Sequence, residues 1–232
     1  MAIALRSVMR SILPVRVRKL LVALRASVTL NAALEQLNCL APGEVPSDDL
    51  LNALIRGWNN DNFVATPEYL RAVASACSQT ELPVLECGSG LSTVICAAMS
   101  RRGPEVWTFE HHPAWRRKVS RAVRKIRGAN VHLPRTPLRM YGEFDWYDAT
   151  LRDLPAQFGV VVCDGPPGTT RGGRAGLLPV LGSRLAPGCL ILMDDAHRAA
   201  EQSVIEHWKN SADMDVTLQP SGVRSFARIV LH

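Results

Sequence analysis

Acidic side chains end three apolar runs of this 232-residue chain: Glu110 ends one, Asp164 a second and the pair Asp194-Asp195 a third, with His197 two residues further on. Such runs are typical of the strands of a parallel sheet, whose carboxyl ends meet at one edge. Carboxylates and imidazoles accept hydroxyl donors and remove protons, so these side chains could bind a sugar and act as a general base. We predict that Asp164, Asp195 and His197 share one crevice as catalytic residues, with Asp195 or His197 as the base.

A glycine turn precedes these acids in the chain. Residues 84–87 form a largely apolar run that leads into Gly88-Ser89-Gly90, and residues 91–99 have a helical composition. A strand, a glycine turn and a helix in this order cradle nucleotides, because glycines let the backbone approach a ligand and the helix start presents free N–H groups. A dinucleotide fingerprint would place a third glycine at Thr93, which disfavours a pyrophosphate site. The turn therefore predicts a ligand site at residues 88–92.

The E-x-G-x-G pattern of residues 86–90 resembles the first motif of the class I S-adenosylmethionine-dependent methyltransferases, and the D-G-P-P-G segment of residues 164–168 resembles the fourth motif of a bacterial-type subgroup. The resemblance implies that S-adenosyl-L-methionine is the cofactor and that Glu110, 20 residues after Gly90, binds the two ribose hydroxyls. The residues that it places at the cofactor are Glu86, Cys87, Gly88, Ser89, Gly90, Ser92, Glu110, His111 and Asp164.

The resemblance also raises the question of a metal. Asp164 and the pair Asp194-Asp195 match the positions of the acids and amide that hold magnesium in catechol-type O-methyltransferases, although Asp195 replaces the amide. Oxygen ligands of this kind suit Mg²⁺. A metal-free site is nevertheless the preferred expectation for this fold, so Mg²⁺ is kept as an alternative and no residue is assigned as a metal ligand.

The elements that must position these residues follow from the hydrophobic pattern. Apolar or alternating runs predict strands at residues 84–87, 105–110, 130–133, 158–163 and 189–193, and a terminal hairpin at 214–218 and 225–231 around Pro220-Ser221-Gly222. Helices are expected at 67–77, 91–99, 115–127 and 199–210, the first of them capped by Thr66. The fold class is therefore α/β: a Rossmann-like three-layer sandwich with a mostly parallel seven-stranded sheet, a C-terminal antiparallel hairpin and an N-terminal helical arm.

Composition sets the domain organisation. A hydrophobic content of 47% over 232 residues suffices for one α/β domain with an appendage. We divide the chain into a basic helical arm and linker, residues 1–62, and a methyltransferase-like domain, residues 63–232. The six cysteines form no C-x-x-C pair and fall largely in apolar runs, which indicates reduced core residues and a cytoplasmic location.

The net charge of +6 lies wholly in the arm, because residues 1–34 hold six basic residues and no acid. Beyond Pro14, an apolar stripe recurs at helical spacing from Val17 to Val28, with basic residues on the other side. The arginines interrupt any stretch of about 20 apolar residues, so a spanning helix and an export signal are not expected. The arm could pack its stripe on the domain or on a second subunit in a homo-oligomer, rest on an anionic membrane, or be a mitochondrial transit peptide if the source is eukaryotic.

Three further segments contain residues that could take part in function. Residues 116–127 hold seven basic residues, but no nucleic-acid motif or aromatic set accompanies them, so a solvated helix face is preferred to a nucleic-acid partner. Aromatic residues between 141 and 147 could line an adenine or substrate pocket or simply pack. Arg171 and Arg174 follow the D-G-P-P-G segment and could bind an anion, although a solvated loop is the commoner setting of such arginines.

The predicted function is methyl transfer from S-adenosylmethionine to a small-molecule or carbohydrate-linked acceptor, at oxygen. One alternative is a nicotinamide-dependent oxidoreductase, disfavoured by Thr93 and by the lack of a hydride-transfer constellation. Another is a noncatalytic Rossmann-like module that uses the arm to bind a membrane or a protein, because the fold alone does not determine activity.

Overall fold

The computed structural model describes residues 14–60, 65–101 and 103–232. Its centre is a seven-stranded sheet in the order β3-β2-β1-β6-β7-β9-β8, in which the first five strands are parallel and β9 is antiparallel to both neighbours. The strands are β1 (Val84–Cys87), β2 (Val106–Phe109), β3 (Val131–His132), β6 (Phe158–Cys163), β7 (Leu185–Met193), β8 (Met214–Ser221) and β9 (Arg224–Leu231). The predicted fold class is confirmed.

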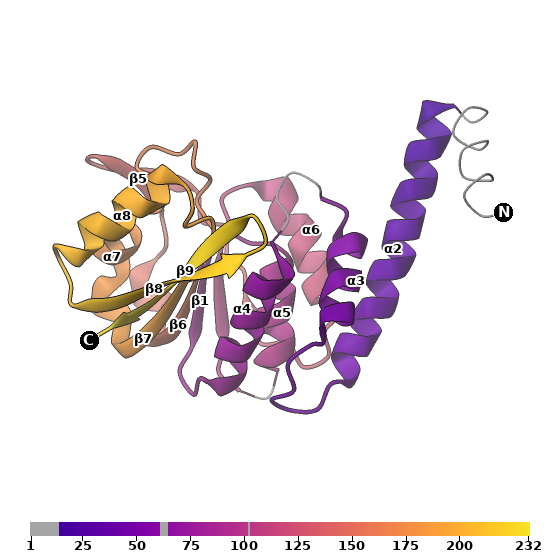
Figure 1. Ribbon diagram of the computed structural model, residues 1–232, viewed down its shortest axis with the longest axis horizontal. Helices are drawn as coiled ribbons and strands as arrows, with labels where there is room; N and C mark the ends of the chain where they lie inside the picture. The colour runs from indigo at the N-terminus through magenta and orange to yellow at the C-terminus, as the bar shows by residue number, and fades with distance from the viewer. Residues whose placement is uncertain (1–13, 61–64, 102) are drawn as a thin grey trace.

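Helices cover both faces of this sheet (Figure 1). One apolar cluster joins the sheet to α3 (Asp48–Trp58), α4 (Pro67–Gln79), α5 (Leu91–Met99) and α6 (Pro113–Val123), and the other joins it to α7 (Leu177–Leu181) and α8 (Ala199–Lys209). Alternation along β1 explains the division: Val84 belongs to the first cluster, whereas Leu85 and Cys87 belong to the second. The result is the expected three-layer sandwich.

Local signals place several of these elements. The Thr66 hydroxyl accepts a hydrogen bond from the Tyr69 N–H at 3.3 Å, and Pro67 occupies the first turn of α4, as the sequence predicts. Five cysteines are buried, Cys39 is exposed and all six are free thiols. The terminal hairpin is longer than predicted, because Pro220 and Ser221 still pair with β9 and the turn follows them.

Three elements were not predicted from the sequence. A second, two-stranded sheet joins β4 (Leu138–Tyr141) to β5 (Phe144–Tyr147), in a segment for which the sequence analysis predicts no strand. The short helix α7 lies in a segment for which the sequence analysis predicts no helix, and β7 begins four residues earlier than the predicted strand of residues 189–193. Trp146 and Tyr147 of β5 are fully buried in the second apolar cluster, so packing accounts for these two aromatic residues.

Within the described residues, the N-terminal arm begins with one long helix, α2 (Val15–Cys39), which projects beyond the rest of the molecule at its amino-terminal end (Figure 1). It packs against α3 through Ala33, Leu34 and Leu37, whereas the predicted stripe from Val17 to Val28 is largely exposed. In the described chain the stripe does not pack on the domain, so this option for the arm is wrong, whereas packing on a second subunit stays a prediction. Arg6 and Arg10 of the arm, and the domain boundary between residues 62 and 63, lie outside the described residues.

Two further properties of α2 bear on its role. By length and composition alone it could cross a membrane, with a mean hydropathy of 1.2 over a window that is 22% buried, which departs from the expectation of no such segment. At its carboxyl end, Arg101 donates hydrogen bonds to the carbonyls of Leu37, Asn38 and Leu40. These carbonyls have no partner within the helix, so Arg101 closes its end.

Candidate functional site

The glycine turn after β1 lies against the loop after β6, and the two contact each other through backbone atoms. Gly88 has a φ of +87°, and a Cβ at this position would lie 2.8 Å from the backbone nitrogen of Gly165. Gly90 is extended, and a Cβ there would meet only the Ser92 hydroxyl at 3.7 Å. Gly88 is therefore required by the fold, whereas Gly90 leaves open space in front of α5.

Glu86 supports this turn from beneath. Its fully buried carboxylate accepts hydrogen bonds from the Ser92 hydroxyl at 2.6 Å and the Thr108 hydroxyl at 2.9 Å, and so ties β1 to α5 and β2. Burial raises the pKa of Glu86 to about 7, and the hydroxyl donors lower it only in part. Both side chains are buried, and Glu86 and Ser92 thus hold the turn in shape.

Glu110 follows β2 and reaches the same turn. One carboxylate oxygen accepts from the Ser89 hydroxyl at 2.7 Å and the Ser89 N–H at 3.2 Å, and the other accepts from the His112 N–H at 2.7 Å. The backbone N–H of Glu110 donates to the Thr136 hydroxyl, which fixes the end of the strand. A carboxylate has about four acceptor positions, so three are filled by donors of the turn and its neighbour.

The remaining predicted cofactor residues differ in placement. His111 is partly exposed, and its Nδ1 lies 3.5 Å from Glu110 Oε1. The Cys87 thiol points into the second apolar cluster, and burial raises its pKa well above the ordinary value. Only the backbone of Cys87 takes part in the site, because its carbonyl accepts from the Asp164 N–H at 3.0 Å.

Asp164, Asp194 and Asp195 come together at the carboxyl ends of β6 and β7, with oxygens within 4.8 Å of one another. Arg174, only 4% exposed, lies among them: its guanidinium is 3.2 Å from an Asp164 oxygen and 3.6 Å from an Asp195 oxygen, and it also donates to the Asp194 carbonyl. Burial, then the neighbouring acids, raise the pKa of Asp164 and Asp194. We call these four residues the acid–arginine cluster.

Residues 85–196 match the family model described as "Methyltransferase domain". This segment is a class I, S-adenosylmethionine-dependent methyltransferase domain. The match contains the glycine turn, Glu110 and the whole acid–arginine cluster. No curated protein matches the chain in sequence.

Solved methyltransferases share the fold. A precorrin-6y C5,15-methyltransferase from Geobacter metallireducens aligns with a TM-score of 0.56 at 13% identity, over 75% of this chain and 92% of that one. An O-methyltransferase from Bacillus cereus in complex with SAH aligns with a TM-score of 0.56 at 15% identity, over 81% and 92%. A tRNA (m1A58) methyltransferase from Aquifex aeolicus aligns with a TM-score of 0.52 at 15% identity, over 80% and 76%.

These likenesses establish the fold of the methyltransferase, and their differing names show that the fold does not select the acceptor. The nicotinamide-dependent alternative finds no support among them.

A divalent cation does not fit the acid–arginine cluster of this methyltransferase well. The three acids are close enough to share an ion, but the Arg174 guanidinium already lies against Asp164 and Asp195. Arg198 pairs with the same Asp195 oxygen at 2.9 Å, and Asp194 Oδ1 accepts from the Asp195 N–H at 2.8 Å. Cationic groups thus occupy one oxygen of Asp164 and one of Asp195, so no step is derived through Mg²⁺.

The two candidate bases differ in their surroundings. Asp195 is nearly buried, has a φ of +57° and keeps one carboxylate oxygen, Oδ1, without a hydrogen-bond partner in the described part of the chain. A non-glycine residue in this region of φ is uncommon and is often found at functional sites. His197 is exposed and takes part in none of the cluster's hydrogen bonds or ion pairs among the described residues. The structure thus brings Asp164 and Asp195 together but leaves His197 outside.

Sequence reasoning missed the central role of Arg174. We expected a solvated loop arginine, yet its side chain is buried and its Nε also lies 3.9 Å from Glu201 of α8. Arg171, by contrast, pairs with Asp145 of β5 at 2.9 Å. The one sequence signal for a buried arginine was the concentration of acids at strand ends, because acids that are buried together require a cation.

Proposed function

We propose that this methyltransferase binds S-adenosylmethionine at the turn of residues 88–90 and transfers its methyl group to an oxygen of a small-molecule or carbohydrate-linked acceptor. The observation that carries the proposal is Glu110, whose carboxylate lies at the carboxyl end of β2 and is hydrogen-bonded to both donors of Ser89. An almost buried acid that is hydrogen-bonded to a glycine turn, at the edge where such sheets bind ligands, supports a role in binding the cofactor.

The turn supplies what the cofactor needs. The open space in front of Gly90 admits a ligand next to the amino-terminal end of α5, and Glu110 can accept two hydroxyls from a ribose. In the described structure the Ser89 hydroxyl fills one of those acceptor positions. A bound ribose would therefore displace the Ser89 side chain, while the backbone N–H of Ser89 keeps its bond to Glu110.

The acid–arginine cluster contains the residues that would activate the methyl acceptor. Methyl transfer is an in-line displacement that requires an aligned nucleophile and, for a hydroxyl, removal of its proton. Asp195 Oδ1, which is buried and has no hydrogen-bond partner in the described part of the chain, is the candidate acceptor of that proton, and Arg174 holds the carboxylates in place and stabilises their charge. His197 remains the second candidate base, because an exposed imidazole could move onto a bound acceptor.

The cofactor assignment is tested by calorimetry with S-adenosylmethionine, S-adenosylhomocysteine and NAD. We expect both S-adenosyl ligands to bind and NAD not to bind. Glu110→Ala should weaken S-adenosylhomocysteine by about 1–3 kcal/mol, the scale of a lost hydrogen bond to a charged group. Glu105→Ala is the matched control, since Glu105 precedes the opposite end of the same strand and pairs with His132. Selective binding of NAD, or equal affinity of Glu110→Ala and the wild type, would overturn the assignment.

The catalytic assignment is tested by release of S-adenosylhomocysteine with a panel of small hydroxylated acceptors. With any acceptor that supports turnover, Asp195→Asn should lower kcat by roughly 10²-fold or more, the usual contribution of a general base. His197→Ala is assayed in parallel. If Asp195→Asn keeps full activity and His197→Ala loses it, the base is His197; if both variants keep full activity, neither residue is the base.

A further inference from the structure

The amino-terminal half of α2, residues 15–28, carries an exposed apolar face. Val17, Leu20, Leu24 and Val28 are separated by three or four residues, so they lie on one side of the helix. Their exposed fractions are 39%, 69%, 60% and 62%. We call these four residues the α2 stripe. Nothing in the described part of the chain covers it.

The packing of α2 explains why the stripe is left uncovered. Hydrogen bonds and ion pairs to the rest of the described chain begin at Asn31, which accepts from Lys125 at 2.6 Å, and include Glu35 with Arg127 at 2.8 Å. The buried residues Ala33, Leu34 and Leu37 are at the carboxyl-terminal end of the helix. The amino-terminal half therefore extends from a firmly attached base (Figure 1).

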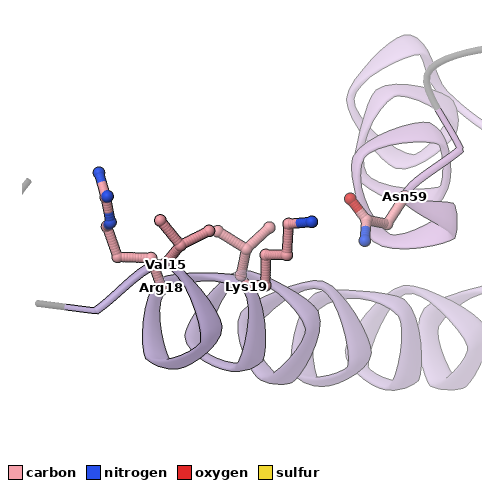
Figure 2. Close-up of a pocket in the computed structure, with 5 residues that line it drawn as sticks. Val15, Arg18, Lys19 and Asn59 are labelled. Atoms are coloured by element: carbon pink, nitrogen blue, oxygen red, sulfur yellow. The ribbon is translucent and has the colours of Figure 1, made fainter.

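The same half of α2 is strongly basic. Arg16, Arg18, Lys19 and Arg25 lie on it, and residues 1–34 contain no acid. Figure 2 shows Val15, Arg18 and Lys19 rising from one side of α2 beside Asn59 at the end of α3, around a shallow hollow of about 470 Å³. At helical spacing Arg16 and Arg25 flank the α2 stripe, whereas Arg18 and Lys19 lie with the exposed Val15 and Val22 on the side of α2 that faces Asn59. No acid of the arm balances the charge.

Charge and length decide which partner fits this surface. Two copies of α2 packed along their stripes would bring their cations together with no acids to pair. A nucleic acid would meet the cations but leave the leucines in water. The 14 described residues of the amino-terminal half rise about 21 Å, less than the roughly 30 Å of a hydrocarbon core. Inserting the remainder of α2 as well would pull Leu34 and Leu37 from their buried contacts.

We propose that the amino-terminal half of α2 docks this protein on the surface of an anionic phospholipid bilayer. The α2 stripe enters the boundary between headgroups and acyl chains, and Arg16 and Arg25 beside it pair with lipid phosphates. Arg18 and Lys19 add positive charge that attracts the helix to the anionic surface. An anionic bilayer surface offers apolar and negatively charged partners at the same place. The amino-terminal half of α2 has neither kind of partner within the described part of the chain.

Vesicle co-sedimentation of the full-length protein tests the proposal. The protein should bind vesicles of phosphatidylcholine with phosphatidylglycerol, bind those of phosphatidylcholine alone far more weakly, and be released by salt. Neutralising Arg16, Arg18 and Lys19 to Gln should weaken binding roughly a hundredfold, since each cation contributes about fivefold. Leu20→Gln with Leu24→Gln should weaken it roughly tenfold or more by removing apolar contact.

A matched control removes two exposed aliphatic side chains elsewhere. Leu218→Gln with Val223→Gln changes β8 and the turn after it, at the far edge of the sheet, and should bind vesicles as the wild type does. Thermal unfolding checks that each variant keeps its fold. Equal binding to both vesicle types, or unchanged binding of either α2 variant, would overturn the proposal. Attachment that resists salt and alkaline carbonate would indicate a spanning helix instead. A dimer that forms without vesicles and that Leu20→Gln with Leu24→Gln dissociates would indicate a second copy of the chain as the partner.

Discussion

Replacing Glu86 by Gln should stabilise this protein at alkaline pH and have little effect at acidic pH. The Glu86 carboxylate is completely buried and accepts hydrogen bonds from Ser92 and Thr108. Burial, the largest cause, raises its pKa from 4.5 to about 7. Gln occupies nearly the same volume and can exchange hydrogen bonds with both hydroxyls, so the substitution removes the charge and keeps the contacts.

The direction of the stability change with pH follows from the linkage between protonation and folding. The folded pKa lies above the unfolded one, so above pH 7 the folded state holds a buried charge that the unfolded state solvates freely. This cost disappears as the pH falls from about 7 towards 4.5, where both states bind the proton. At pH 8 the difference amounts to about 3 kcal/mol, and at pH 5 to less than about 1 kcal/mol.

Urea unfolding at the two pH values measures this effect. Glu86→Gln should raise the free energy of unfolding by about 3 kcal/mol at pH 8, or the melting temperature by roughly 6–12 °C. Glu206→Gln is the control, because Glu206 is an exposed partner of Lys209 and should change stability by less than about 1 kcal/mol. A Glu86→Gln variant that is less stable than the wild type at pH 8, or equally stabilised at pH 5, would refute the reasoning.

Other perturbations separate structural from functional residues. Gly88→Ala should cost about 2 kcal/mol or more in urea unfolding, because of its positive φ and the close backbone of Gly165, whereas Gly90→Ala should stay within about 0.5 kcal/mol of the wild type. Equal losses would contradict this distinction. Arg174→Met should lower the free energy of unfolding by about 3–5 kcal/mol by leaving buried acids without their cation, and a neutral effect would show that the acids are protonated. Methyl transfer should survive dialysis against EDTA; activity that is lost and then restored by Mg²⁺ would show that a metal displaces Arg174.

The sequence alone was enough to locate the sheet and the glycine turn. Continuous apolar runs such as residues 158–163 can be buried only as strands covered on both faces, and the acids that follow them then lie at one edge. Glu110 and Asp164 could be placed at the ends of β2 and β6 on this basis. The order of the strands in the sheet was not predicted, because the apolar runs do not say which strands are neighbours.

Interactions between distant segments could not be predicted in the same way. Arg174 is buried because it contacts acids that follow β6 and β7 and an acid of α8. The sequence around residue 174 contains no local pattern that predicts these contacts. The spacing from Val17 to Val28 correctly indicates one apolar face, yet the face that packs is set by Ala33, Leu34 and Leu37. Helical periodicity identifies a stripe, but it does not say which partner the stripe meets.

The contact between Arg101 and the end of α2 makes the arm part of one cooperative folding unit. Detaching the helix would leave the Arg101 guanidinium without the carbonyls of Leu37, Asn38 and Leu40 and would expose the leucines beneath. Proteolysis near residue 29 would spare these contacts, whereas a cut beyond Leu34 would remove a buried side chain from the core. Only the outer turns of α2 can therefore be lost without unfolding the protein that carries them.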